Sequence, residues 1–431
     1  MKYFFPFILF LAACGQPAAE KAASIVINED IPRFWQAYDA IRATNDSSSQ
    51  YSLLDSLYIR PATPGLKAFM ERRQYRPQDF IHAINAYPRF WESVRENTLN
   101  SAKYAGAIEA DVVRLHGLYP ALKPAKIYFT IGALMSGGTT LDDKVLIGAE
   151  IAMGDTKVVT EELPEWLSAN LSRHFSNNPV NDVVLLNLHE YVHTQQKRHG
   201  YDLLSQSLYE GVAEFVSVTA AEKPSTAPAV NYGKANDARI RARFVTEMFS
   251  PNWDDWLYNN FRNEFEVRDL GYYVGYAICE HYYTEAANKQ QAIAKLIELD
   301  FGDKTAVEAF VDSTGYFLKP ISEMRKAYEA SVPTVIRIEP FDHNEKPEPG
   351  RQRITVHFSR PMNPRFRGFD FGPLGQEHVL PVDEFIGFSD DSLSISFFTM
   401  IEKGKTQQLT LSNRFRTAAG VALVPYLIEV K

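Results

Sequence analysis

The sequence predicts an α+β protein in two parts, a mostly helical domain with a small sheet followed by an all-β sandwich. The chain has 431 residues, more than one ordinary domain, and 45% of them are hydrophobic, enough for a buried core in each part. Apolar residues recur every three or four positions as far as about residue 330, the spacing of amphipathic helices. From about residue 333 onward apolar and polar residues alternate, with Gly, Pro and Asn between the runs, which is typical of short strands.

The first residues predict export and a lipid anchor. Lys2 precedes an apolar run from Tyr3 to Ala13, the layout of a signal peptide, and this run is too short to span a membrane. The end of the run, "LAAC", resembles a bacterial lipobox, in which Cys14 is acylated; the alternative is an ordinary cleaved signal with an incidental cysteine. We therefore expect a signal peptide over 1–13, a tether over 14–27, and a protein of the bacterial cell envelope, periplasmic or surface-exposed, held to a membrane by lipid on Cys14.

Composition narrows the class of partner. The net charge is -8 and no stretch is rich in Lys and Arg, which argues against nucleic acid as a partner. If Cys14 carries lipid, Cys279 is the one remaining thiol, so no intrachain disulfide can form. The aromatic-rich helical stretch around Cys279 predicts a buried, inert thiol.

Within residues 28–332 the sequence predicts helices first and a small sheet after them. Aromatic and aliphatic residues at helical spacing fill 31–43 and 79–99, with Pro or Asp near each start. The β-rich runs 125–134 and 144–153 predict two strands, joined by "SGGTTLDD" (136–143) as a glycine-containing loop. The second of these strands is compatible with an edge strand, to which a peptide could add, or with an interior strand.

The stretch "DVVLLNLHEYVHTQQKRHG" (182–200) predicts a helix that carries a metal site. His189 and His193 are at i and i+4, so both imidazoles project from one helix face and can bind one Zn²⁺. Glu190 can act as general base and take a proton from a metal-activated water. These residue types at this spacing match H-E-x-x-H, the motif of zinc metalloproteases.

A third protein ligand must come from further along the chain. His199 completes the histidine spacing of metzincins, but Gln196 stands where those enzymes have a chain-turning Gly. With Gln196 the helix is expected to continue, which would carry His199 about 9 Å beyond His193 along the axis. Glu210 is the stronger candidate, because "SLYEGVAEF" resembles the "NEGFAxY" segment in which M1-type aminopeptidases, a gluzincin family, supply a metal-binding Glu. Glu214, one turn later, is the alternative ligand or an outer partner of a ligand histidine.

The flanking segments carry a wider resemblance. "SGGTTLDDKVLIGAE", "HEYVHTQQ", "SLYEGVAEF" and "RDLGYYVGYAICEHYY" occur in this order within roughly 30–330. This combination resembles the DUF2268 family of predicted zinc-dependent proteases, whose relatives include gliding-motility lipoproteins of the GldB kind. The resemblance implies a zincin-like fold over 28–332 and a peptidase activity. One spacing departs from the gluzincin pattern: sixteen residues separate His193 from Glu210, where the aminopeptidases have two more.

The last of these segments offers candidate catalytic phenols. Tyr272, Tyr273 or Tyr276 could donate a hydrogen bond to a developing oxyanion, or could simply pack in the core. We take Tyr272 and Tyr273 as the candidate catalytic residues of this group. Arg268 could bind a substrate carboxylate or pair with a neighbouring acid.

Residues 333–431 predict a separate all-β domain. Its segment "FSRPM" (358–362) resembles a strand end of bacterial Ig-like domains, which implies an Ig-like sandwich. Nothing in this part resembles a catalytic motif. We expect it to act as a spacer or to contact carbohydrate or protein at the envelope.

These expectations combine into one functional hypothesis and one rival. The hypothesis is a membrane-anchored zinc peptidase that acts on a peptide or protein substrate, with Glu190 as general base and Zn²⁺ bound by His189, His193 and Glu210. The rival is a non-catalytic envelope lipoprotein that uses the same fold for binding or assembly, as in a gliding or secretion component. The presence of Glu190 beside both histidines favours the enzyme.

Overall fold

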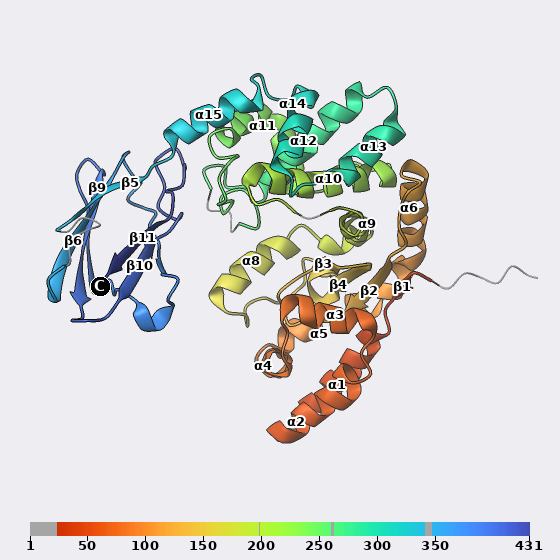
Figure 1. The fold of residues 1–431 in the computed structure, drawn as a ribbon. Coiled ribbons are helices and arrows are strands. Elements are labelled where there is room, and N and C mark those ends of the chain that lie inside the picture. Colours follow the sequence, from red (N-terminus) through yellow and green to blue (C-terminus); the bar gives the residue numbers. More distant parts are fainter. Residues whose placement is uncertain (1–23, 198, 260–262, 341–346) are drawn as a thin grey trace, which may run out of the picture.

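The computed structural model describes residues 24–197, 199–259, 263–340 and 347–431, and within them the predicted α+β class is confirmed. The helical body and the sandwich each have their own hydrophobic core, the first running from Val26 to Met324 and the second from Ile338 to Val430. In Figure 1 the sandwich lies to one side of the helical body, and the chain passes between them after α15 (Ile321–Ser331). The boundary predicted at residue 333 lies between the two cores.

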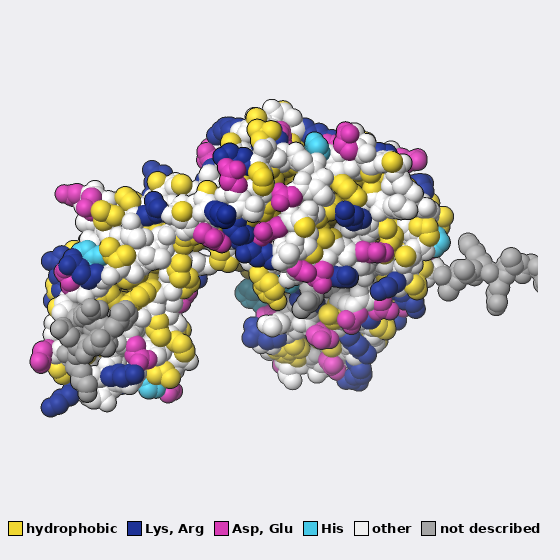
Figure 2. Space-filling model, turned by 45° about the horizontal axis from the view of Figure 1, so that its top comes forward, with side chains coloured by type: hydrophobic (Ala, Val, Ile, Leu, Met, Phe, Trp, Pro, Cys, Tyr) yellow, Lys and Arg dark blue, Asp and Glu magenta, His cyan; other side chains and the backbone are white. Residues whose placement is uncertain are grey.

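The predicted signal peptide, the lipidation site Cys14 and most of the predicted tether lie outside the described residues. No helix in the part that the structure describes has both the length and the apolar character needed to cross a bilayer. Basic and acidic side chains are interspersed over the face shown in Figure 2, so this face has no extended region of one charge.

Six α-helices lie between the first and the second strand of the sheet along the chain. Several begin with a proline at the first helical position, whose fixed φ suits a helix start and whose missing N–H would be unpaired there. The six helices are α1 (Asp30–Arg42), α2 (Ser47–Leu54), α3 (Pro64–Arg73), α4 (Pro77–Ala86), α5 (Pro88–Leu99) and α6 (Ala105–Leu118). A short π-helix, Asp55–Ile59, continues α2, and a 3₁₀ turn, Ser101–Tyr104, precedes α6.

The body contains one four-stranded sheet with the order β1-β2-β4-β3. Its strands are β1 (Val26–Ile27), β2 (Lys126–Thr130), β3 (Gly138–Leu141) and β4 (Lys144–Gly148). β1, β2 and β4 run parallel, whereas β3 pairs with β4 in the antiparallel sense and forms the edge. α3 contacts β2, β3 and β4, and α9 (Val183–His193) contacts β3 and β4. Figure 1 shows these two helices on opposite faces of the sheet, so the metal-motif helix lies next to the edge strand.

Two expectations about this sheet are corrected. The strand at 144–148 is interior, and the chain turns helical directly after it in α7 (Ala149–Ala152), so the predicted run to 153 is too long. The segment "SGGTTLDD" is not only a loop, because it contains the edge strand β3. Gly138 is a weak strand former, whereas Thr139 and Thr140 are good ones, and pairing with the strongly apolar β4 completes the strand.

The remaining helices complete the body around α10. They are α8 (Glu165–Phe175), α10 (Leu203–Ala221), α11 (Pro228–Phe244), α12 (Leu270–Glu285), α13 (Lys289–Glu298) and α14 (Lys304–Thr314), with a 3₁₀ turn at Pro179–Asn181. α10 packs most extensively on α12. Gly211 and Gly275 make this approach possible, because a Cβ on Gly211 would lie 2.2 Å from the carbonyl carbon of Gly275.

The C-terminal part is built from two small antiparallel sheets, with the orders β5-β6-β9-β8 and β11-β10-β7. The strands are β5 (Val335–Glu339), β6 (Gly350–Phe358), β7 (Phe369–Phe371), β8 (Glu384–Phe388), β9 (Ser394–Ile401), β10 (Gln407–Leu411) and β11 (Tyr426–Val430), with a 3₁₀ turn at Gln376–His378. Apolar side chains of both sheets meet in one core, among them Ile354, Phe397 and Leu411, each with no exposed surface.

Candidate metal centre

Two neighbouring helices bring three buried ligand groups together. His189 and His193 lie one turn apart on α9, and Glu210 lies on α10, which packs against α9. The two imidazole Nε2 atoms are 3.1 Å apart, and Oε2 of Glu210 is 3.4 Å from Nε2 of His189 and 3.2 Å from Nε2 of His193. Ligand atoms of a tetrahedral ion bound at about 2.0 Å are about 3.3 Å apart, so the three atoms fit one metal ion.

Each histidine has an outer partner that orients its ring. Nδ1 of His189 lies 3.3 Å from Oε2 of Glu214, whose other oxygen accepts a hydrogen bond from Ser225. Nδ1 of His193 lies 2.5 Å from Oε1 of Gln196. Both rings therefore present Nε2 to the shared centre, as in sites where an outer acceptor fixes the tautomer of a metal-binding histidine. Glu214 occupies the outer position that the sequence left as an alternative to direct ligation.

The carboxylate of Glu210 is also held from both sides. Its Oε2 faces the two imidazoles, and its Oε1 accepts hydrogen bonds from the Tyr258 hydroxyl and, at 3.5 Å, from Nε2 of Gln206. Nε2 of Gln206 also donates to the Tyr258 hydroxyl at 3.0 Å. These contacts leave Glu210 one orientation, with Oε2 toward the centre.

Charge within the cluster is strongly coupled. Burial favours the neutral imidazole of His189, but the hydrogen-bonded carboxylates of Glu210 and Glu214 outweigh it and raise the pKa of His189 to about 10. Burial also opposes ionisation of Glu210, yet His193 and His189 hold its pKa well below the ordinary value. The carboxylates of Glu210 and Glu214 thus favour a positive charge between them. Either the proton of an imidazolium or a divalent cation would supply this charge.

Glu190 lies beside this centre, against the edge strand. Its side chain is 9% exposed and rests on Gly138 of β3, where an added Cβ would come 2.7 Å from Oε1 of Glu190. Burial raises the pKa of Glu190, while His193 and His189 oppose the shift. A carboxylate whose pKa is raised in this way is a better proton acceptor near neutral pH.

The predicted tyrosines separate in the structure. Tyr272 stacks on His189, with ring centroids 6.0 Å apart, and burial followed by the charge of Glu210 raises the pKa of Tyr272, which keeps its phenol protonated. The Tyr273 hydroxyl instead donates to Asp237 of α11 at 2.9 Å and does not point to the cluster. The Tyr276 hydroxyl lies 3.1 Å from Glu280 and is likewise turned away.

Other candidates of the sequence lie outside the cluster. α9 ends at His193, so the expected continuation of the helix to His199 is wrong; Nδ1 of His199 lies 3.3 Å from the carbonyl oxygen of Gly200 and takes no part in the group of three ligands. Nε of Arg268 pairs with Asp269 at 2.6 Å, the second of the two roles considered for it. Cys279 is buried, and burial raises the pKa of its thiol, as expected of an inert cysteine.

Sequence reasoning missed several groups that shape the site, among them Gln196, Gln206 and Tyr258. Gln206 lies one turn before Glu210 on the same helix, so helical spacing could have identified it. Gln196 enters the sequence argument only as an obstacle to His199, although it lies three residues beyond His193. Tyr258 lies 48 residues beyond Glu210 in a segment without regular structure, and no local pattern points to it.

Comparison with known proteins adds no family to this description. No protein-family model and no curated protein matches the chain. Among solved structures, the crystal structure of the S-layer protein rSbsC(31-844) aligns with a TM-score of 0.18 and 11% identity over 94% of this chain and 44% of that chain. The structure of surface layer protein SbsC, domains 1–6, aligns with a TM-score of 0.19 and 11% identity over 93% and 44%. The present chain spans less than half of each, and likenesses of this size carry no argument about fold or function.

Proposed function

We propose that the protein is a zinc-dependent peptidase of the bacterial envelope, anchored through lipid on Cys14. The observation that carries the proposal is the meeting of His189, His193 and Glu210 at ligand–ligand distances suited to one ion, with Glu190 next to them. Two imidazoles and one carboxylate are a donor set that suits Zn²⁺ and leaves a coordination position open, as in catalytic zinc sites. Bound there, Zn²⁺ would lower the pKa of water and polarise a substrate carbonyl.

The chain's own groups can supply the rest of the chemistry. Glu190 takes the proton of the attacking water and can return it to the leaving amine. The protonated phenol of Tyr272, stacked on His189, is the candidate to donate a hydrogen bond to the developing oxyanion, whereas the O–H of Tyr258 is already donated to Glu210.

The edge strand β3 offers a place for an extended peptide. The carbonyl of Gly137 accepts from the N–H of Gly148 in β4, so by the antiparallel alternation Gly138 and Thr140 turn their backbone groups to the open edge. A peptide that adds to this edge would run alongside Gly138, against which Glu190 rests. The carbonyl of Gly138 already accepts hydrogen bonds from Arg73 and Ser136, so among the described residues the N–H of Gly138 and the backbone groups of Thr140 are left to pair with a peptide.

The test pairs metal analysis with a variant that removes only the base. Purified protein should contain one zinc per chain, and Glu190→Gln should keep the zinc while losing cleavage of a peptide library by roughly a hundredfold or more. A chain that binds no zinc would exclude the metalloenzyme. Zinc without any cleavage that depends on Glu190 would favour the rival, a binding or assembly protein with the same fold.

A further inference from the structure

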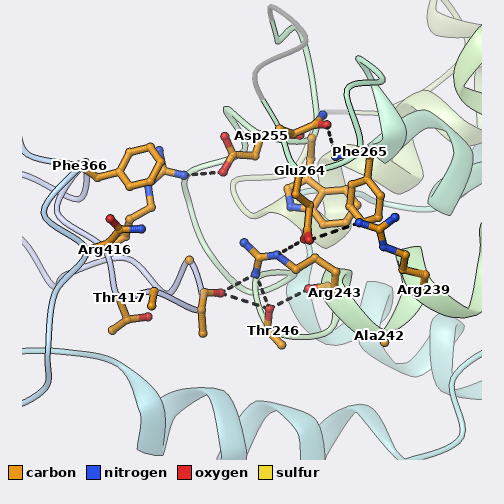
Figure 3. Close-up of a pocket in the computed structure, with 16 residues that line it drawn as sticks. Arg239, Ala242, Arg243, Thr246, Asp255, Glu264, Phe265, Phe366, Arg416 and Thr417 are labelled. Atoms are coloured by element: carbon orange, nitrogen blue, oxygen red, sulfur yellow. Dashed lines mark hydrogen bonds and ion pairs between the residues drawn. The ribbon is translucent and has the colours of Figure 1, made fainter.

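A cavity of about 590 Å³ lies between the helical body and the sandwich. The body lines it with the end of α11 and with residues around Asp255 and Phe265, and the sandwich lines it with Phe366 and the 416–420 loop. Figure 3 shows Arg416 of the sandwich directed toward Asp255 of the body across this space. Two lines of polar contact start in the sandwich and end on a single turn of the body, Trp253–Leu257, which we name the 253–257 turn.

The first line is the ion pair between Arg416 and Asp255. Nη1 of Arg416 lies 2.7 Å from Oδ2 of Asp255, as drawn in Figure 3, and the guanidinium stacks on the ring of Phe366, 4.1 Å from its centroid. Arg416 is only 7% exposed, and the sandwich holds its backbone through a hydrogen bond from the N–H of Asn363 to its carbonyl. Among the described residues, the pair of Arg416 and Asp255 is the one ion pair that joins the sandwich to the body.

The second line starts at the tip of the same loop. The carbonyl of Ala419 accepts from Nη1 of Arg243 at 2.5 Å, and Arg243 pairs with the buried Glu247. Oε2 of Glu247 in turn accepts from the indole N–H of Trp256, in the 253–257 turn, at 3.0 Å. Gly420 has a φ of +85° and approaches so closely that a Cβ there would lie 2.2 Å from Oε1 of Glu247.

The 253–257 turn leads directly into Tyr258, which contacts the metal site. The backbone φ of Tyr258 is +54°, in the left-handed region that a bulky L-residue occupies only where its surroundings hold it. The Tyr258 hydroxyl donates to Oε1 of Glu210, while Oε2 of Glu210 faces the two imidazoles. The orientation of a metal ligand thus depends on a residue whose backbone is under constraint.

We propose that Arg416 is a positioning residue of the metal centre. By holding Asp255 it keeps the 253–257 turn in place, and the turn keeps the Tyr258 hydroxyl on Glu210. The sandwich is in this way part of the metal site, although it contributes no group to the centre itself. This inference rests on the proposed function only in assuming that the site binds a metal, and its readout is metal affinity rather than cleavage.

The test compares variants on both sides of the contact in the full-length chain. Arg416→Ala and Asp255→Asn should each weaken zinc binding severalfold, and Tyr258→Phe by about tenfold, since loss of an outer partner typically costs 10- to 100-fold. Dissociation constants come from competition with a chromophoric chelator, and the visible spectrum of the Co²⁺ form reports the geometry at Glu210. Arg416→Lys, which can still donate to Asp255, should restore the affinity.

Arg414→Ala is the matched control, because Arg414 lies 3.8 Å from Asp370 within the sandwich. It should leave both the dissociation constant and the Co²⁺ spectrum unchanged. Arg416→Ala combined with Tyr258→Phe should bind zinc no more weakly than Tyr258→Phe alone, because the two changes break the same line of contacts. Losses that multiply, or an Arg416→Ala affinity equal to that of Arg414→Ala, would overturn the inference while leaving the peptidase proposal intact. A wild-type chain without zinc would contradict both.

Discussion

The helical body and the sandwich differ in what they bury. The body contains glutamates that are each less than 10% exposed, namely Glu150, Glu190, Glu210, Glu214 and Glu247. Among the described residues of the sandwich no carboxylate is buried, and its one buried charged residue, Arg416, points toward the body. Its core is formed mainly by aliphatic and aromatic side chains, and the other polar side chains buried there, such as Gln407 and Thr399, are uncharged.

This difference separates a part built around a site from a part built for stability. A buried carboxylate costs free energy unless hydrogen bonds or opposite charges compensate it. In the body these carboxylates hold other groups in place. Glu210 and Glu214 contact the histidines, and Glu150 accepts backbone N–H groups of the segment before the edge strand. Among its described residues the sandwich buries no carboxylate, and apolar packing should supply most of its stability.

The largest expected effect concerns the proposed metal ligands of the body. Glu210→Ala removes one of three protein donors and should weaken zinc binding by roughly a thousandfold or more, about 4 kcal/mol. Zinc content after purification and chelator competition measure the loss. His199→Ala is the control and should keep full occupancy, because His199 lies outside the cluster. Retained zinc in Glu210→Ala together with loss in His199→Ala would reverse the ligand assignment.

A second prediction concerns Glu150, which has no exposed surface. Burial raises its pKa to about 7, against the opposing hydrogen bonds from Gly132 and Leu134. Between pH 4.5 and 7 the folded chain therefore binds more protons at Glu150 than the unfolded chain does, so this group makes stability fall as pH rises through that window.

Glu150→Gln should remove this pH dependence. The free energy of unfolding of the variant relative to wild type should increase by roughly 3 kcal/mol from about pH 4 to about pH 8. Urea denaturation at a series of pH values measures it, with Glu161→Gln at an exposed position as control. Parallel curves for wild type and Glu150→Gln would show that the Glu150 carboxylate is not destabilised by burial.

A third prediction concerns the helix contact that places Glu210 opposite Tyr272. Gly211→Ala brings a methyl group into the backbone of α12 at Gly275 and should destabilise the body by about 1–3 kcal/mol. The midpoint of chemical denaturation measures it. Gly106→Ala in α6, where a Cβ meets nothing within 4 Å, should instead stabilise by about 0.5–1 kcal/mol. Equal effects at the two glycines would contradict the close approach of α10 and α12.

The smallest effect is expected in the sandwich. The hydroxyl of Thr399 is buried and has no hydrogen-bond partner in the described residues, whereas that of Thr355 lies 2.9 Å from the Ser396 hydroxyl. Thr399→Val should therefore stabilise the sandwich by about 1 kcal/mol, and Thr355→Val should cost about the same. Thermal unfolding of the two variants checks the opposite signs. A destabilised Thr399→Val would mean that the buried Thr399 hydroxyl stabilises this core more than a methyl group does.

Local patterns were enough for one part of the site. His189, Glu190 and His193 lie within five residues on one helix, and helical geometry alone sets the relation of their side chains. The end of that helix was not predictable in the same way, because no Gly or Pro stands between His193 and His199 to stop it. A similar limit applied to β3, because Thr residues that favour a strand lie there between Gly and Asp residues that favour a turn, and pairing with β4 selects the strand.

Periodicity and spacing within short windows were enough to predict the α+β class, the change of architecture near residue 333, and the placement of His189, Glu190 and His193 on one helix. Only the tertiary structure decided that Glu210 faces the imidazoles while Glu214 stands behind His189, since that depends on how α10 packs on α9. It also brings the Tyr258 hydroxyl to Glu210 and Arg416 to Asp255. Their contacts join residues 48 and 161 positions apart, and no pattern along a chain encodes such distances.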